Sequence, residues 1–203
     1  MNFIVRLSYV FIIIGMTACT TIPRPPFLTH SNQAALSWQK RQYLLSHITY
    51  WQLKGKIAIV TAHKSGSAIV NWTENKQSFT ISLLGPLGTS SLTLTGQPGY
   101  VTLNTADGKR YTAKSPEQLL VQEWKWHIPV SSLQFWVRGL PVPSIPSNSQ
   151  FDHAHRLLSL TQQGWNIQFL NYMRIGKIDL PSRLSVSSPT ITTKIVIYEW
   201  HIK

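Results

Sequence analysis

The sequence is poor in cysteine and in acidic residues, and each shortage excludes a class of chemistry. Cys19 is the only cysteine among 203 residues, so the chain cannot form an internal disulfide. Seven acidic residues stand against 19 lysines and arginines, and no two carboxylates have a spacing typical of general acid–base catalysis. No serine lies in a nucleophile elbow, and no glycine-rich phosphate-binding loop follows a predicted strand. We therefore predict that the protein is not an enzyme and uses no metal or diffusible cofactor.

The sequence also lacks an apolar run long enough to span a bilayer. Residues 7–14 form a short apolar segment behind the single charge of Arg6. About ten apolar residues is the length of a signal-peptide core rather than of a transmembrane helix. The next segment, Met16-Thr17-Ala18-Cys19, resembles the lipobox of bacterial lipoproteins, although Met16 replaces the usual leucine. In a lipobox the cysteine sulfur carries a diacylglyceryl group after cleavage, whereas the alternative for Cys19 is a buried thiol or a metal ligand.

These features predict three segments. Residues 1–18 are a lipoprotein signal peptide, and residues 19–32 are the lipidated Cys19 followed by a proline-rich tether. The covalent diacylglyceryl and N-acyl groups on Cys19 are the expected lipid modifications. Residues 33–203 are the folded domain, of normal size for one domain. Thr20 follows the cysteine, and the absence of aspartate there is typical of lipoproteins sent to the outer membrane.

The charge is strongly basic, with a formal net value of +12. Such a charge indicates an anionic partner, and outside the cytoplasm nucleic acid is not expected. An anionic phospholipid leaflet or an acidic protein remains, beside the simpler interpretation of a soluble basic surface. The eight tryptophans are many for a core of this size, and they favour a large apolar site or a membrane-facing rim.

Period-two alternation of apolar residues predicts a mainly β fold. About eleven strands follow one another in meander order, with turn signals such as Gln97-Pro98-Gly99 between them. Clear alternation begins at Tyr50 and at Phe79, and two separate strands are expected over 175–180 and 184–186. Helices are expected over 31–47, after Ser115-Pro116, and from Pro129 to Gly139, while 142–151 reads as a loop. We predict an antiparallel, barrel-like sheet that wraps around helices.

Two short segments are candidates for function. Gly85, Pro86, Leu87 and Gly88 join two predicted strands, and a leucine between chain-bending residues is unusual at a turn. Leu87 is therefore expected either to protrude toward a bilayer or a partner, or to fold back onto the core. His153 and His155 can lie on one face of a strand as a metal pair, but solvated loop histidines are the simpler interpretation.

Several segments together resemble the LolB family of outer-membrane lipoprotein receptors. They are GPLG (85–88), QPGYVTL (97–103), GKRYTAKSPEQLL (108–120), PVSSLQFWVRGLP (129–141) and KIVIYEW (194–200). The resemblance implies an incomplete antiparallel β-barrel of about eleven strands that encloses an apolar cavity covered by helices. It also implies a receptor that accepts lipoproteins from the periplasmic carrier LolA and places them in the inner leaflet of the outer membrane. It implies that Leu87 is the protruding residue of a membrane-insertion loop. The expected protein is a lipid-anchored, periplasm-facing monomer whose partners are LolA, client lipoproteins and the phospholipid bilayer.

Inward-facing apolar positions give the predicted acyl-chain cavity, although alternation alone does not distinguish a hollow barrel from a packed one. Two other hypotheses remain: an envelope-assembly scaffold with a solid core, and a lipid-modifying enzyme with His153 or His155 as base. The predicted cavity residues are Trp51, Leu53, Ile57, Val70, Trp72, Phe79, Ile81, Leu83, Leu92, Leu94, Trp136, Trp165, Phe169 and Ile197.

Overall fold

The computed structural model describes residues 36–86 and 91–203. They belong to one compact unit, Ala34–Lys203, which carries its own hydrophobic core. The predicted signal peptide, Cys19 and the tether lie outside the described residues, as do Leu87 and Gly88. In the described ranges no helix is both long and apolar enough to cross a membrane.

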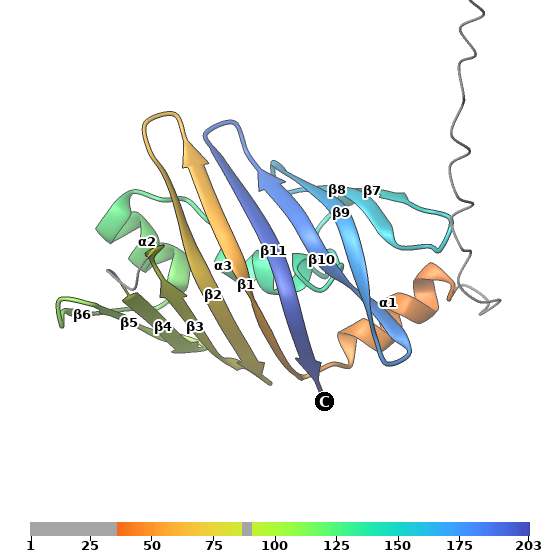
Figure 1. Ribbon diagram of the computed structural model, residues 1–203, viewed down its shortest axis with the longest axis horizontal. Coiled ribbons are helices and arrows are strands. Elements are labelled where there is room, and N and C mark those ends of the chain that lie inside the picture. Colours follow the sequence, from red (N-terminus) through yellow and green to blue (C-terminus); the bar gives the residue numbers. More distant parts are fainter. Residues whose placement is uncertain (1–35, 87–90) are drawn as a thin grey trace, which may run out of the picture. The chain divides into compact units, whose positions relative to one another are not determined.

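A single antiparallel sheet of eleven strands accounts for most of the described residues (Figure 1). Its order is β6-β5-β4-β3-β2-β1-β11-β10-β9-β8-β7, and the outermost strands β6 and β7 do not pair with each other. The predicted incomplete barrel is therefore confirmed. The bounds are Tyr50–Thr61 (β1), Ser65–Asn75 (β2), Ser78–Leu84 (β3), Ser91–Gln97 (β4), Tyr100–Thr105 (β5), Arg110–Ala113 (β6), Ser147–Phe151 (β7), Leu157–Gln162 (β8), Trp165–Ile175 (β9), Ile178–Ser187 (β10) and Ile191–Ile202 (β11).

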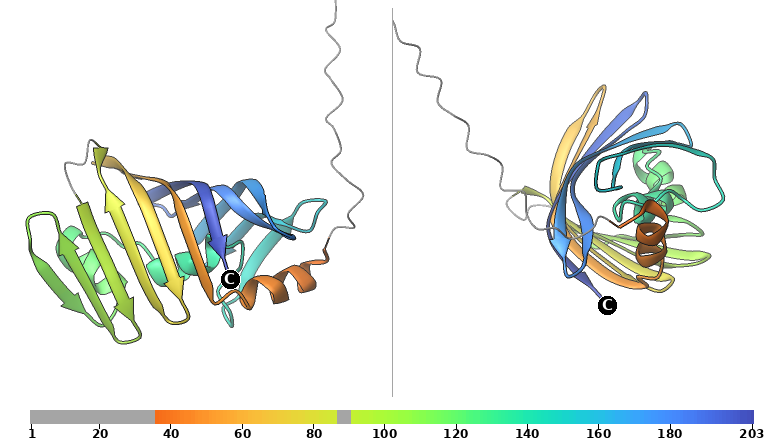
Figure 2. Two further views of the ribbon diagram at one scale, coloured as in Figure 1. Left: turned by 60° about the horizontal axis from the view of Figure 1, so that its bottom comes forward. Right: turned by 90° about the vertical axis from the view of Figure 1, so that its right-hand side faces the viewer.

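Three helices lie on the inner side of the curled sheet (Figure 2). They are α1 (Trp38–Ser46), α2 (Pro116–Trp124) and α3 (Val130–Trp136). Helix α2 begins as predicted, because the Ser115 side chain accepts a hydrogen bond from the Gln118 amide and Pro116 occupies the first turn. Helix α1 begins later than predicted, since its capping residue is Ser37.

Two details of the strand prediction are wrong. One strand was missed and one was counted twice, so the predicted number of strands is unchanged. The segment 142–151, expected to be a loop, ends in the edge strand β7, whose polar residues give no alternation signal. The residues around Pro181, expected to separate two strands, form the single strand β10. Pro181 has no amide hydrogen, but the register of β10 against β9 shifts around it, and pairing of β10 with β11 begins only at Arg183.

The first helix is held to the sheet by a buried arginine. Arg41 donates hydrogen bonds to the backbone oxygen of Asp179 at 2.9 Å and to its carboxylate at 3.2 Å. Arg174 donates to the other carboxylate oxygen at 3.1 Å. Because Arg41 is almost fully buried, removing Asp179 leaves a buried charge without its counter-charge, which is strongly destabilising.

Candidate lipid-binding site

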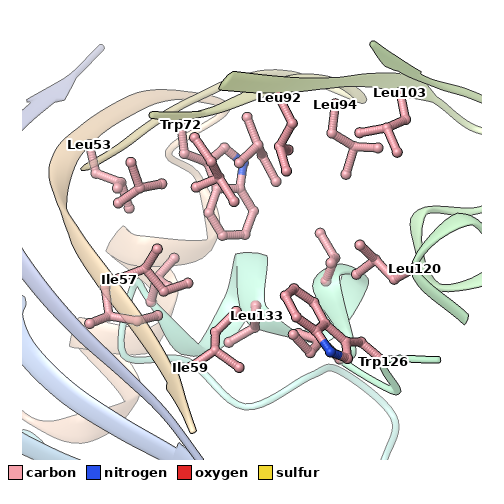
Figure 3. A pocket seen from close by; sticks show the side chains of 17 residues that line it. Leu53, Ile57, Ile59, Trp72, Leu92, Leu94, Leu103, Leu120, Trp126 and Leu133 are labelled. Atoms are coloured by element: carbon pink, nitrogen blue, oxygen red, sulfur yellow. The ribbon is translucent and has the colours of Figure 1, made fainter. Parts of the chain in front are cut away.

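An entirely apolar cavity lies between the sheet and the α2–α3 segment (Figure 3). Its volume is about 80 Å³. Strands β1 to β5 form one wall, β11 contributes one residue, and the helices with their connecting segment form the other wall. The lining residues are Leu53, Ile57, Ile59, Val70, Trp72, Ile81, Leu83, Leu92, Leu94, Leu103, Leu120, Trp126, Ile128, Val130, Leu133, Val137 and Ile195.

A second, wider pocket of about 650 Å³ adjoins the first. The two share Ile57, Ile59, Leu83, Leu92 and Trp126, so one layer of side chains separates them. The outer pocket lies at the end of the sheet where β1 ends and β2 begins, and where β3 leads into the segment beginning Gly85-Pro86. Its other lining residues are Thr61, Lys64, Ser65, Gly66, Ser67, Ala68, Gly85, Pro86, Ser91, Thr105, Ala106 and Asp107.

The volumes decide how this site can hold a ligand. Pockets for small ligands measure about 300–1,000 Å³, so the inner cavity alone is too small for a long acyl chain. An apolar cavity of this size stays dry, and the missing contacts cost the fold about 2 kcal/mol. Filling by a chain therefore requires the inner and outer pockets to join, by displacement of the side chains that both pockets share.

The structure divides the predicted cavity residues into two groups. Eight of them line the inner cavity. The other six are in the core or packed against it but not in the cavity wall. The lining group is Leu53, Ile57, Val70, Trp72, Ile81, Leu83, Leu92 and Leu94, and the other group is Trp51, Phe79, Trp136, Trp165, Phe169 and Ile197.

Sequence reasoning missed lining residues in the strands, in the helices and in the segment between α2 and α3. Ile59 and Leu103 belong to the alternation of predicted strands but were not assigned to the cavity. Trp126 and Ile128 lie between α2 and α3, in a segment with no periodicity that reveals an inward side chain. Leu133 and Val137 lie in the helix expected from Pro129 to Gly139, of which only Trp136 was assigned to the cavity.

Trp72, which lines the inner cavity, packs in a cluster with two tryptophans that are not in the cavity wall. The ring of Trp51 lies 5.2 Å from that of Trp72 and 5.6 Å from that of Trp200, measured between centroids. The indole nitrogen of Trp200 donates to the Pro181 oxygen at 2.9 Å. These rings come from three neighbouring strands, β2, β1 and β11, and they form a buried aromatic cluster.

A carboxyl group is buried beside this aromatic cluster. Glu74 is 6% exposed and accepts a hydrogen bond of 3.0 Å from the indole nitrogen of Trp72. Burial raises the pKa of Glu74 from 4.5 to about 7, although the hydrogen bond from Trp72 and the charge of Arg138 act in the opposite direction. Glu74 thus fixes the orientation of a tryptophan that lines the cavity.

Arg138, immediately after α3, connects the helical wall to the start of the sheet. Its guanidinium donates to the backbone oxygens of Leu45 and Ile48, at 3.3 and 3.2 Å. It also lies 5.9 Å from the ring centroid of Trp51 and 5.4 Å from that of Phe135. A cation placed against two aromatic rings and two carbonyls is well satisfied despite burial. Helix α3 is therefore anchored at its C-terminal end.

The two histidines lie in the turn between β7 and β8. His153 and His155 are exposed, and the Asp152 carboxylate accepts hydrogen bonds from the Ala154 and Arg156 amides, each at 2.9 Å. Among the described residues no group of three or more histidine, cysteine, aspartate or glutamate side chains is placed to hold a metal. Their exposure favours the interpretation as solvated loop histidines.

Comparison with known proteins agrees with this architecture. The family model described as outer membrane lipoprotein LolB matches residues 49–200. The chain belongs to the LolB family. It is 39% identical over 163 residues to the outer-membrane lipoprotein LolB of Pseudomonas syringae pv. syringae, covering 80% of each chain. It is 35% identical over 185 residues to the protein of the same name from Coxiella burnetii strain RSA 493, covering 91% of this chain and 87% of the relative.

Solved structures show the same fold at much lower sequence identity. A LolA superfamily protein from Nitrosomonas europaea aligns with a TM-score of 0.53 at 8% identity, covering 83% of this chain and 94% of that one. A DUF1329 family protein from Desulfovibrio piger aligns with a TM-score of 0.56 at 7% identity, over 82% and 90%. LolB proteins are outer-membrane lipoproteins and trafficking receptors rather than enzymes, so family membership confirms that expectation.

Proposed function

We propose that this protein accepts lipoproteins from the periplasmic carrier LolA and inserts them into the inner leaflet of the outer membrane. The observation that carries the proposal is the wholly apolar inner cavity with a wider pocket beside it. An acyl chain entering through the outer pocket meets polar side chains first and only apolar ones inside. No described residue offers a reactive group in this cavity, in keeping with carriage rather than chemistry.

The energetics of acyl chains explain why such a cavity is needed. A lipid chain in water costs about 0.8 kcal/mol per methylene, or roughly 10 kcal/mol for a whole chain. A free lipoprotein therefore does not cross an aqueous compartment unaided. Transfer from cavity to cavity is downhill when the receptor binds the chains more tightly than the carrier does, and it needs no nucleotide.

Location and delivery complete the proposal. Lipid attached to Cys19 anchors the protein to the outer membrane facing the periplasm, and the proline-rich tether extends from it. Gly85 and Pro86 line the outer pocket. They place the start of the loop that carries Leu87 beside the proposed entrance. Leu87 then enters the bilayer and delivers the lipoprotein next to it, and the protein works as a monomer.

One observation favours a second candidate function. The inner cavity is small, and a solid barrel serving as an envelope-assembly scaffold predicts a core with only such minor voids. The two candidates differ in acyl binding, which the receptor has and the scaffold lacks. The exposed histidines give no support to the lipid-modifying enzyme.

The test is transfer of a labelled, acylated lipoprotein from purified LolA to the chain beginning at Thr20, followed by addition of liposomes. The receptor proposal expects the label to move to this protein and then into liposomes. A label that stays on LolA contradicts the proposal and supports the scaffold. A Cys19→Ala variant produced in cells is expected to be released from the membrane while still accepting lipoprotein, which separates anchoring from binding; failure to accept contradicts a cavity that works without the anchor.

A further inference from the structure

A row of four exposed side chains and one half-buried side chain, Val196, crosses the outer face of the sheet, away from the cavity. Strand pairing places Arg183 opposite Val196, Val196 opposite Lys56, Lys56 opposite Ile69, and Ile69 opposite Leu84. These five residues come from the adjacent strands β10, β11, β1, β2 and β3. Neighbouring strands are about 4.8 Å apart, so the row is roughly 20 Å long. We call these five residues, together with Lys194, the outer row.

The cations of the outer row have no acidic partner among the described residues. Lys56, Lys194 and Arg183 are exposed, and none of them forms an ion pair there. Lys194 is opposite Ala58, two residues along from the Val196–Lys56 pair and toward the outer pocket.

The acids on the same strands are already engaged. Glu74 is buried inside the sheet, Asp179 is held by Arg41 and Arg174, and Glu199 pairs with Lys54 at 3.1 Å. The outer row therefore presents uncompensated positive charge, which is complementary to an anionic surface.

Apolar side chains continue the row toward the loop that follows β3. Ile69 is 50% exposed and Leu84 is 41% exposed, and the two are direct cross-strand partners. Leu84 immediately precedes Gly85 and Pro86, which line the outer pocket. Positive charge thus passes into exposed aliphatic surface, and that surface passes into the entrance of the proposed site. This order of charge, aliphatic surface and entrance suits a membrane interface, where cations meet headgroups and aliphatic residues meet the acyl boundary.

We propose that the outer row docks on anionic phospholipid headgroups and so turns the outer pocket toward the bilayer. The inference deepens the proposed function, because it gives that function a second membrane contact besides the loop. Each lysine or arginine near an anionic surface contributes about fivefold in affinity. Two lysines and an arginine on one face therefore bind well without any lipid-specific pocket. Docking orients the molecule, and the loop needs only to insert.

The experiment measures binding of the chain beginning at Thr20 to sedimented vesicles, with no lipoprotein present. One set contains phosphatidylcholine alone, and the other contains phosphatidylcholine mixed with phosphatidylglycerol. Wild type is expected to bind the anionic vesicles more tightly and to lose this preference at high salt. Lys56→Gln/Lys194→Gln is expected to bind anionic vesicles about thirtyfold more weakly. Ile69→Thr/Leu84→Thr is expected to weaken binding to both vesicle types.

The matched control is Lys76→Gln/Lys177→Gln. Both lysines lie in turns at the opposite end of the sheet, after β2 and after β9, and the double variant loses the same charge. It is expected to bind within about twofold of wild type, because net charge alone acts weakly beyond the screening length. Equal losses in the two double variants overturn the outer row as a docking surface, as does an unchanged affinity in the Lys56 and Lys194 variant.

Acceptance of lipoprotein from LolA is measured on the same variants without vesicles. Wild-type acceptance by the Lys56 and Lys194 variant, together with weak vesicle binding, supports the proposal. Normal vesicle binding with impaired acceptance overturns it and assigns the row to a protein partner. If wild type fails to accept lipoprotein, the proposed function fails, and the vesicle result still decides the docking surface.

Discussion

The two halves of the sheet have the same strand pattern and different interiors. In the packed half, β7–β11, the inward residues Leu157, Leu160, Ile167, Leu180 and Leu184 are completely buried. In the cavity half, β1–β6, several inward residues are only partly buried and face a cavity. Alternation therefore determines which side chains face the interior of a curled sheet. The element that packs against the sheet determines whether this interior is filled.

The interior of the packed half is filled by a tryptophan that is held by hydrogen bonds. Trp136 is fully buried, and its indole nitrogen donates to the Gln162 side-chain oxygen at 3.1 Å. The Gln162 side-chain oxygen also accepts a hydrogen bond from the Val142 amide, and the side-chain nitrogen donates to the backbone oxygens of Val142 and Ile145. A buried amide with every contact satisfied holds the 142–146 segment firmly against the strands. In the cavity half the lining residue Trp72 makes a single bond of this kind, from its indole nitrogen to the Glu74 carboxylate at 3.0 Å.

The largest effect is expected from removing this filler. Trp136→Ala should lower the free energy of unfolding by about 3–5 kcal/mol, because it opens a large void and removes one of the two hydrogen-bond donors to the Gln162 side-chain oxygen. Leu92→Ala, in the half-buried cavity wall, should cost less than about 2 kcal/mol. Urea denaturation of both variants measures the contrast. Similar losses at the two positions contradict the division into a packed and a hollow half.

A pH dependence of stability is expected from Glu74. Its folded pKa of about 7 lies above its ordinary 4.5, so the folded state holds the proton more tightly than the unfolded state does. This stabilisation is complete below about pH 4.5 and is lost as the pH rises toward 7, by up to about 3 kcal/mol. Unfolding measured between pH 5 and 8 should show the decline in wild type, and Glu74→Gln should flatten it. An unchanged slope in Glu74→Gln assigns the decline to other groups.

Filling the cavity half should separate binding from stability. Leu92 lines both pockets, so Leu92→Trp blocks the passage between them. We expect the unfolding free energy to stay within about 1 kcal/mol, because the ring occupies existing space. Binding of a fluorescent fatty acid should weaken at least about tenfold. Unaltered binding in a folded variant shows that acyl chains do not use this passage.

The smallest effect on stability is expected at the loop of the cavity half. Leu87→Glu should leave the thermal midpoint unchanged and block delivery of bound lipoprotein to liposomes, because a charge resists entry into the bilayer. Acceptance from LolA should continue in this variant. A large fall in the thermal midpoint instead places Leu87 in the core.

Sequence patterns predicted the fold well and the cavity only partly. Alternation located strands such as β1 and β3, and Ser115-Pro116 located the start of α2. Pro181 misled because a bulge in an interior strand looks like a break, and β7 was missed because an edge strand needs no apolar residues. Trp136 and Trp165 were predicted to line the cavity but do not. The pattern identifies them as inward-facing, but it does not show which helix packs against which part of the sheet. Trp126 could be assigned to the cavity only once the path of the chain between α2 and α3 was known.

The unpaired outer strands have a mechanical consequence. In a closed barrel, strand number and stagger set the radius, so the interior cannot widen without breaking ladder hydrogen bonds. Here β6 and β7 are free of each other, and the short edge strand β6 contacts α2. The curvature of the sheet can therefore decrease slightly while the hydrogen bonds between neighbouring strands stay intact. Side-chain packing against the helices, rather than backbone geometry, then sets the width of the interior.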